Sequence, residues 1–179
     1  LFTGHLMSET PPRSALLANG DPMSAIHSFS LPGLDEISTR TGVGEAEWVT
    51  MKMVENAASV KGSGALAELF ALGPPDMTLG KRRQMIWMTA LHGVDHYLLA
   101  IAPVDSRANI EKPAYYNPHT VTQPWFHALR ELGVDAEMAA RYAGKKAIRK
   151  IAVRYPQSLT AATLFLPGEK QPVFNLQQF

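Results

Sequence analysis

The sequence predicts an α/β fold built around a parallel sheet. Short apolar segments of strand length alternate with longer segments in which apolar residues recur every third or fourth position. The segment 94–103 is apolar almost throughout, which is typical of a parallel strand buried on both faces. Strands that alternate with helices in this way favour parallel pairing through right-handed crossovers.

The first half of the chain contains three predicted strands and one predicted helix. Residues 3–9 and 25–31 are the first two strands, and the second ends at a Pro-Gly turn signal. A helix is predicted over 45–59, where apolar residues fall three and four positions apart. Glycines end this helix before the third strand, 65–72.

The centre of the chain predicts a helix followed by a buried strand. Asp76 or Thr78 can cap a helix over 79–92, whose apolar residues form a broad core-facing side. Gly93 suits the position after the helix, because glycine adopts the left-handed conformation without strain. The strand 94–103 follows. We expect it to lie parallel to the preceding strand, with this helix as their connection.

The end of the chain predicts more helix and a change of domain. Two helices are expected at 125–132 and 135–144, and a strand at 148–155. The segments before about residue 145 supply roughly four βα units, half of an eight-stranded barrel. We therefore expect a partial (β/α)8 (TIM-type) barrel over 1–145, and a linker with the start of a following domain over 146–179. Because the chain opens directly in strand-like sequence, we expect it to be a piece of a longer protein.

Composition excludes several classes of function. The chain has 179 residues, of which 46% are hydrophobic, enough for one domain with a core. A formal net charge of +1 provides no field to attract nucleic acid or an anionic membrane, and no apolar run approaches the roughly 18 residues of a spanning helix. There is no cysteine, hence no disulfide framework or thiolate nucleophile. We predict no nucleic-acid partner and no membrane partner.

Two patterns that resemble cofactor sites have simpler explanations. His92 and His96 are spaced like a helical zinc-binding pair, but Gly93 ends the predicted helix between them. Lys61 precedes two glycines, whereas the lysine of a phosphate-binding loop follows them, so a helix-to-strand turn explains this segment better. We predict no cofactor and no bound metal ion.

Two glutamates are the candidate catalytic residues. Glu9 and Glu68 each lie where a strand-like run meets a loop, and two carboxyl groups from separate strands are what cleavage of a glycosidic bond requires. Glu68 stands in an otherwise apolar run, where an unpaired carboxylate would be costly to bury. The alternative for Glu68 is a structural ion pair with Lys61 or an arginine. The alternative for Glu9 is an exposed loop acid.

Other polar and aromatic residues are candidates for binding a sugar. His5 alternates onto the same strand face as Glu9 and can hold its carboxyl group or a sugar hydroxyl. Asp35 follows a predicted strand and can bind hydroxyls or cap a helix. A later loop is dense in aromatic rings and amides, which suit the apolar faces and hydroxyls of a pyranose. There we place Tyr116 and Asn117 at the rim of a pocket.

Five motifs occur in order along the chain: Thr3-Gly-His-Leu-Met-Ser-Glu9, Phe29-Ser-Leu-Pro-Gly-Leu-Asp35, Gly64-Ala-Leu-Ala-Glu-Leu-Phe70, His92-Gly-Val-Asp-His-Tyr97 and Gln123-Pro-Trp-Phe126. Their order and spacing resemble the second half of the barrel in large multidomain bacterial glycoside hydrolases of the β-galactosidase and α-L-rhamnosidase type. The catalytic domains of that family are (β/α)8 barrels. The resemblance covers about residues 1–130.

The resemblance implies a role for each candidate. Glu9 corresponds to the acid/base residue, and Glu68 to the nucleophile or base that acts on a carbohydrate substrate. The strand 94–103 would line the sugar site, which adds His96 to the substrate-binding residues. The early barrel strands are missing from this chain. We therefore expect open sheet edges that favour self-association, and a fragment incomplete for activity on its own.

Two alternatives remain open beside the glycoside hydrolase. One is a non-catalytic α/β carbohydrate-binding or assembly module derived from such a barrel, which keeps the fold without turnover. The other is a small α/β enzyme of different chemistry in which Glu68 is structural.

Overall fold

A four-stranded parallel sheet forms the centre of the molecule. The computed structural model describes residues 2–6, 20–36, 48–69, 78–99 and 128–143, with Leu16, Ala152, Arg154, Ser158, Ala162 and Phe165 as single residues. The strands are β1 (Thr3–Leu6), β2 (Leu31–Glu36), β3 (Leu66–Leu69) and β4 (His96–Leu99). The helices are α2 (Pro22–Ser28), α3 (Trp48–Lys61), α4 (Leu79–Leu91) and α5 (Leu129–Ala143). The strands lie side by side in chain order, so the predicted α/β class is confirmed.

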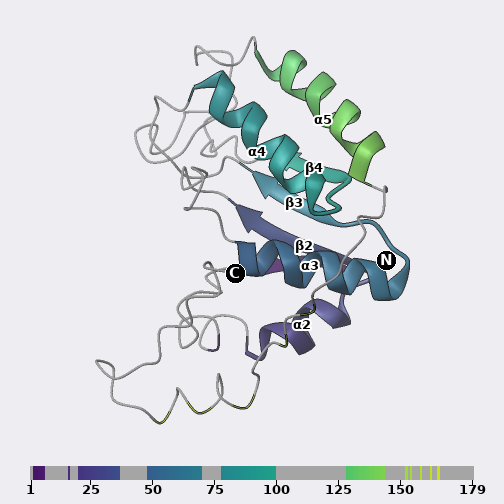
Figure 1. Cartoon of the computed structure of the whole chain (residues 1–179), viewed down its shortest axis with the longest axis vertical. Coiled ribbons are helices and arrows are strands. Elements are labelled where there is room, and N and C mark those ends of the chain that lie inside the picture. The colour runs from purple at the N-terminus through teal and green to yellow at the C-terminus, as the bar shows by residue number, and fades with distance from the viewer. Residues whose placement is uncertain are drawn as a thin grey trace, which may run out of the picture.

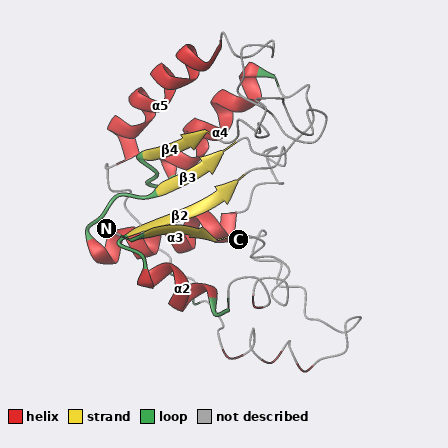
Figure 2. Cartoon of the chain, turned by 180° about the vertical axis from the view of Figure 1, so that it is seen from behind, coloured by secondary structure: helices red, strands yellow, loops and turns green. Residues whose placement is uncertain are grey.

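The described helices lie on one face of this sheet. Figure 1 looks onto the helices, whereas Figure 2, from behind, shows the strands in front of α3 and α4. Successive right-handed crossovers between strands in chain order produce this arrangement. Because side chains alternate along a strand, Leu34, Ala67 and Leu69 point into the core on the helix side. The intervening residues point to the opposite face, which no described helix covers.

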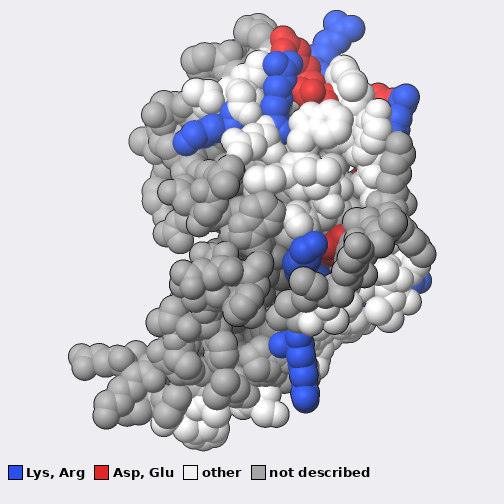
Figure 3. Space-filling view, viewed as in Figure 1, with Lys and Arg blue, Asp and Glu red and all other residues white. Residues whose placement is uncertain are grey.

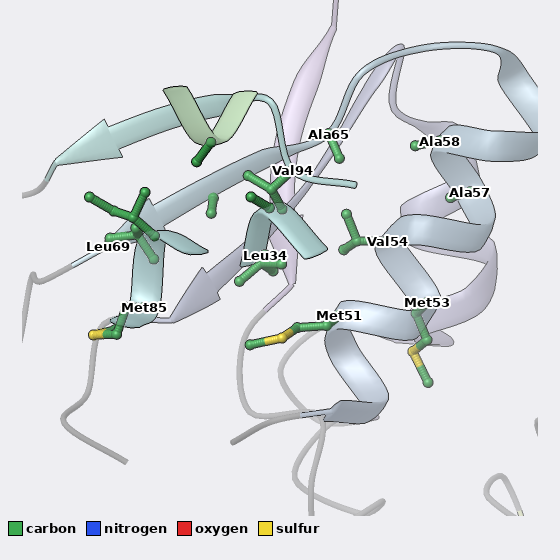
Figure 4. Packing of buried hydrophobic residues seen from close by; sticks show 14 of the residues in the cluster. Leu34, Met51, Met53, Val54, Ala57, Ala58, Ala65, Leu69, Met85 and Val94 are labelled. Carbon is green, nitrogen blue, oxygen red and sulfur yellow. The ribbon is translucent and has the colours of Figure 1, made fainter. Parts of the chain in front are cut away.

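The core between sheet and helices is built from methionines and aliphatic residues. Met51 and Val54 of α3 and Met85 and Ile86 of α4 are fully buried in one cluster, part of which Figure 4 shows. Burial of each such side chain stabilises the fold by roughly 1.5–3 kcal/mol. Ala67 at the centre of β3 is also fully buried, and its small side chain leaves room for these larger ones.

The unit β3–α4–β4 is bounded by the residues that the sequence predicts. Thr78 caps α4, because its hydroxyl oxygen accepts a hydrogen bond from the backbone N–H of Lys81 at 3.2 Å. Gly93 follows the C-cap residue His92 with a φ of +86°, which glycine adopts without strain. Strands β3 and β4 pair in parallel on either side of this helix in sequence. The predicted parallel pair and its connecting helix are therefore confirmed.

Helix α5 packs on α4 through a ring contact and two ion pairs. The rings of Trp87 and Tyr142 lie 6.0 Å apart, centroid to centroid. Arg83 on α4 donates from Nη2 to Glu131 Oε2 and from Nε to Asp135 Oδ2 on α5, both at 2.7 Å. Charged side chains of both signs lie together over these two helices in Figure 3.

One predicted strand is wrong, and two predicted helices form one continuous helix. The segment 25–31, predicted as a strand, is mostly helix: α2 covers residues 22–28, and β2 starts only at residue 31. Asp21 caps α2 by accepting a hydrogen bond from the backbone N–H of Ser24, and Pro22 occupies the first helical turn. The two helices predicted at 125–132 and 135–144 are replaced by the single helix α5.

Several predictions fall outside the described residues. The strand predicted at 148–155 is described only at Ala152 and Arg154, neither of which is in a strand. The second domain over 146–179 therefore stays a prediction. Among the described helices, none has the length and apolar character needed to cross a membrane.

A histidine–carboxylate cluster as the candidate functional site

Three predicted site residues meet on the helix-free face of the sheet. His5, Asp35 and Glu68 are each the penultimate residue of their strand, β1, β2 and β3 respectively. Asp35 and Glu68 are direct partners in the parallel register, whereas His5 pairs with Gly33, one pleat earlier. The shared face and the shared strand ends bring the three side chains together at the carboxyl edge of the sheet.

His5 contacts both acids through its two ring nitrogens. His5 Nδ1 lies 3.3 Å from Asp35 Oδ2, and His5 Nε2 lies 3.2 Å from Glu68 Oε2. The sequence hypothesis of a structural ion pair for Glu68 named Lys61 or an arginine. Among the described ion pairs its partner is His5 instead, and Lys61 is exposed at the end of α3.

Gly33 on β2 allows the side chain of His5 on β1 to contact Glu68 on β3. Neighbouring strands are about 4.8 Å apart, so a residue on β1 must extend across β2 to touch β3. A Cβ atom at position 33 would lie 3.3 Å from the Cβ of His5 and 2.6 Å from the backbone oxygen of Gly4. The sequence marked this glycine only as part of a turn, yet it lies inside β2. It is the residue of the site that sequence reasoning missed.

Burial and charge act on the carboxyl groups of this cluster. The side chain of Asp35 is 5% exposed, and its Oδ1 atom has no hydrogen-bond partner among the described residues. The side chain of Glu68 is 18% exposed and that of His5 30%. Burial, with a second contribution from the charge of Asp35, raises the pKa of Glu68, while His5 opposes that rise. Glu68 is thus the acid that both holds a proton more readily and stays accessible.

The cluster also has a donor set that metal ions accept. One imidazole nitrogen and one oxygen from each carboxyl group lie within 4.8 Å of one another. Such mixed nitrogen and oxygen donors suit divalent transition metals. The same atoms already pair directly with each other at 3.2 and 3.3 Å, so the arrangement is accounted for without an ion.

The other predicted site residues are not part of the described cluster. Glu9, Tyr116 and Asn117 lie outside the described residues. His96 begins β4 and pairs with Leu66 in the register, one pleat before the level of Glu68. Its side chain is mostly exposed, and its Nδ1 lies 2.7 Å from Asp95 Oδ1.

A second polar group lies on the helix side of the sheet. His92 Nδ1 lies 3.6 Å from Glu55 Oε2, and Lys52 Nζ lies 3.0 Å from the same oxygen. Burial, together with the charge of Lys52, lowers the pKa of His92 to about 4. These residues join the end of α4 to α3, and we assign them to stability.

The fold and the cluster define an α/β protein with a histidine–carboxylate site at the carboxyl ends of parallel strands. Comparisons with known proteins found no matching family model, curated protein or solved structure. The function must therefore be argued from the cluster.

Proposed function

We propose that this chain is part of a glycoside hydrolase catalytic barrel in which Glu68 delivers the proton to the glycosidic oxygen. The observation behind the proposal is the setting of Glu68. Its carboxyl group lies at the carboxyl end of a parallel strand, partly accessible, next to a second acid, with its pKa raised. Active sites of barrel enzymes are built at this end of the strands, and a general acid needs a raised pKa.

The sheet supports the barrel interpretation. In a (β/α)8 barrel, parallel strands follow one another in chain order, helices cover the outer face, and the other face lines the interior. The four described strands follow the chain, and the described helices cover one face. His5, Asp35 and Glu68 would then project into the mouth of the barrel, where a sugar would bind.

The raised pKa favours a different division of roles from the one implied by the family resemblance. That resemblance gave the acid role to Glu9 and the nucleophile role to Glu68. A raised pKa makes a carboxyl group a better candidate for proton donation than for nucleophilic attack. We therefore assign proton donation to Glu68, and attack on the sugar or activation of water to Glu9, which follows β1.

The chemistry follows from these roles. Glu68 transfers its proton to the glycosidic oxygen as the bond between that oxygen and the anomeric carbon breaks. The bonding electrons leave with the oxygen, and the departing group is released as an alcohol. The second carboxylate attacks the anomeric carbon or removes a proton from an attacking water. Asp35 is too deeply buried to reach the substrate, so its role is to support the cluster.

The proposal is tested with Glu68→Gln in the longest reading frame that contains this chain. We expect hydrolysis of a panel of aryl and alkyl glycosides by the parent protein, and a loss of about 100- to 10,000-fold in the variant. Glu137→Gln is the matched control, because Glu137 is an exposed α5 residue that pairs with Arg141. Its activity should equal that of the parent.

Two outcomes would contradict the proposal. Sugar binding without turnover in the parent protein would indicate the carbohydrate-binding module instead. Turnover that survives Glu68→Gln would show that Glu68 is structural. Circular dichroism of both variants establishes that any loss is not due to unfolding.

A further inference from the structure

Both ring nitrogens of His5 face an acid. Asp35 Oδ2 and Glu68 Oε2 approach opposite ring nitrogens at 3.3 and 3.2 Å. A neutral imidazole has one N–H donor, so it can satisfy only one ionised carboxylate. A doubly protonated imidazole carries a positive charge, which acids at ion-pair distance from both ring nitrogens stabilise. Two acceptors on a single ring therefore favour the charged form of His5.

We propose that His5 is a positioning residue: a doubly protonated imidazole, held by Asp35 across Gly33, that fixes Glu68 Oε2 and leaves Glu68 Oε1 for the substrate.

The surroundings of His5 support the charged form. The described acids that face it are Asp35 from β2 and Glu68 from β3. Asp35 is almost fully buried, and a buried carboxylate needs a compensating partner. His5 provides that partner, while its own side chain stays 30% exposed and retains part of its hydration. Gly33 keeps the path between the two outer strands clear.

The consequence for catalysis rests on the proposed function of Glu68. While Glu68 is protonated, its Oε2 accepts a hydrogen bond from His5 Nε2–H as a neutral group. When Glu68 releases its proton to the glycosidic oxygen, the same contact becomes a charge-assisted hydrogen bond. An interaction that strengthens as the reaction proceeds lowers the barrier. His5 retains both of its protons throughout, so no proton is gained or lost elsewhere.

The protonation of His5 can be measured without any turnover. We would record two-bond ¹⁵N–¹H spectra of the histidine rings of this chain at pH 7, and assign the His5 signals by their loss in His5→Gln. We expect both ring nitrogens to be protonated in most of the molecules. An isolated imidazole would be doubly protonated in only roughly a quarter of them.

Asp35→Asn tests the source of the effect. The amide keeps an acceptor of similar shape but removes the charge, so the doubly protonated fraction should fall at least twofold. His96 of β4, which pairs with the preceding residue Asp95, is the internal control, and its ring signals should not change. If Asp35→Asn does not fold, Glu68→Gln removes the acid at the other ring nitrogen, whose ionised form also favours the charged ring, and should lower the fraction in the same direction.

Three results would overturn the proposal that His5 is a doubly protonated positioning residue. The first is a neutral His5 ring in the parent chain, and the second is a fraction unchanged in both variants. The third is a ring that is neutral with EDTA and whose signals shift when Zn²⁺ is added, which would make the cluster a cation site.

The catalytic consequence has its own readout. In the hydrolysis assay, His5→Gln should lower kcat about 10- to 100-fold and leave KM nearly unchanged, because the lost interaction develops in the transition state. A change confined to KM would show that His5 binds sugar and does not position Glu68. The spectra test the protonation of His5 without any turnover, and the assay tests its effect on hydrolysis. Failure of the His5 proposal is therefore distinguishable from failure of the proposed function.

Discussion

Gly33, which has no side chain, allows His5 to reach the two acids of the candidate site. Gly33 lies beside His5 in the register of β1 and β2. Any side chain there would meet the backbone of Gly4 and the Cβ of His5. The Pro-Gly pair at 32–33 is a strong local turn signal, but both residues are buried inside a strand. Pairing with the two neighbouring strands outweighs the turn preference of the Pro-Gly pair. No sequence pattern reveals this pairing.

We predict that Gly33→Ala destabilises the fold by about 1–3 kcal/mol, the usual cost of overpacking. The obstacle is a backbone oxygen 2.6 Å from the new Cβ, which cannot move aside as a flexible side chain would. Urea unfolding measures the change. Gly133→Ala is the matched control: nothing lies within 4 Å of its Cβ position inside helix α5. There the substitution should stabilise by about 0.5–1 kcal/mol. Similar changes at both glycines would contradict the close approach at Gly33.

The sequence predicts the residues of the site better than the contacts between them. His5, Asp35 and Glu68 were each candidates from the sequence alone. The sequence placed His5 beside Glu9, because residues two or four apart share a strand face. Its contacts with Asp35 and Glu68 depend on the register between strands, and a shift of one residue would send a side chain to the other face.

At the level of elements, local capping signals decided which predictions succeeded. The Thr78 cap and Gly93 bound α4, and both were recognised in the sequence. The equivalent signal for α2 is Asp21 followed by Pro22, and it outweighs the short apolar run that predicts a strand at 25–31. Asp135 was interpreted as the start of a new helix, but its carboxylate pairs with Arg83 on α4, and α5 continues through it.

The junction of α3 and α4 predicts a pH dependence of stability. Burial, together with the charge of Lys52, lowers the pKa of His92 to about 4 in the folded chain, against about 6.5 when unfolded. Between these values the unfolded chain binds a proton that the folded chain does not. The stabilising contribution of the neutral ring is therefore present above pH 6.5 and is lost as pH falls to 4.

The measurement is the free energy of unfolding of the parent chain and of His92→Gln from pH 7 to pH 3.5. The stability of the parent should fall relative to the variant between pH 6.5 and 4, then change little. The comparison cancels other groups that titrate in this range and do not contact His92. A difference independent of pH would mean that His92 is not kept neutral by burial.

On the scale of the whole molecule, the sheet separates the hydrophobic core from the candidate site. The helix side holds the core, and the other side carries His5, Asp35 and Glu68 at the strand ends. Within the described residues, β1 and β4 each pair on one side only. The predicted self-association through such edges, and closure into a full barrel, remain predictions. Strand count and closure depend on chain pairings that local sequence patterns do not encode.

The most direct test of Glu68 as the proton donor is the leaving-group dependence of Glu68→Gln. The quantity is kcat/KM for a phenyl glycoside and for the 2,4-dinitrophenyl glycoside of the same sugar. A phenolate needs protonation to depart, whereas a dinitrophenolate does not. We predict a loss of about 100- to 10,000-fold for the first substrate and less than about tenfold for the second. Equal large losses for both would identify Glu68 as the nucleophile, and no loss for either would exclude it from the reaction.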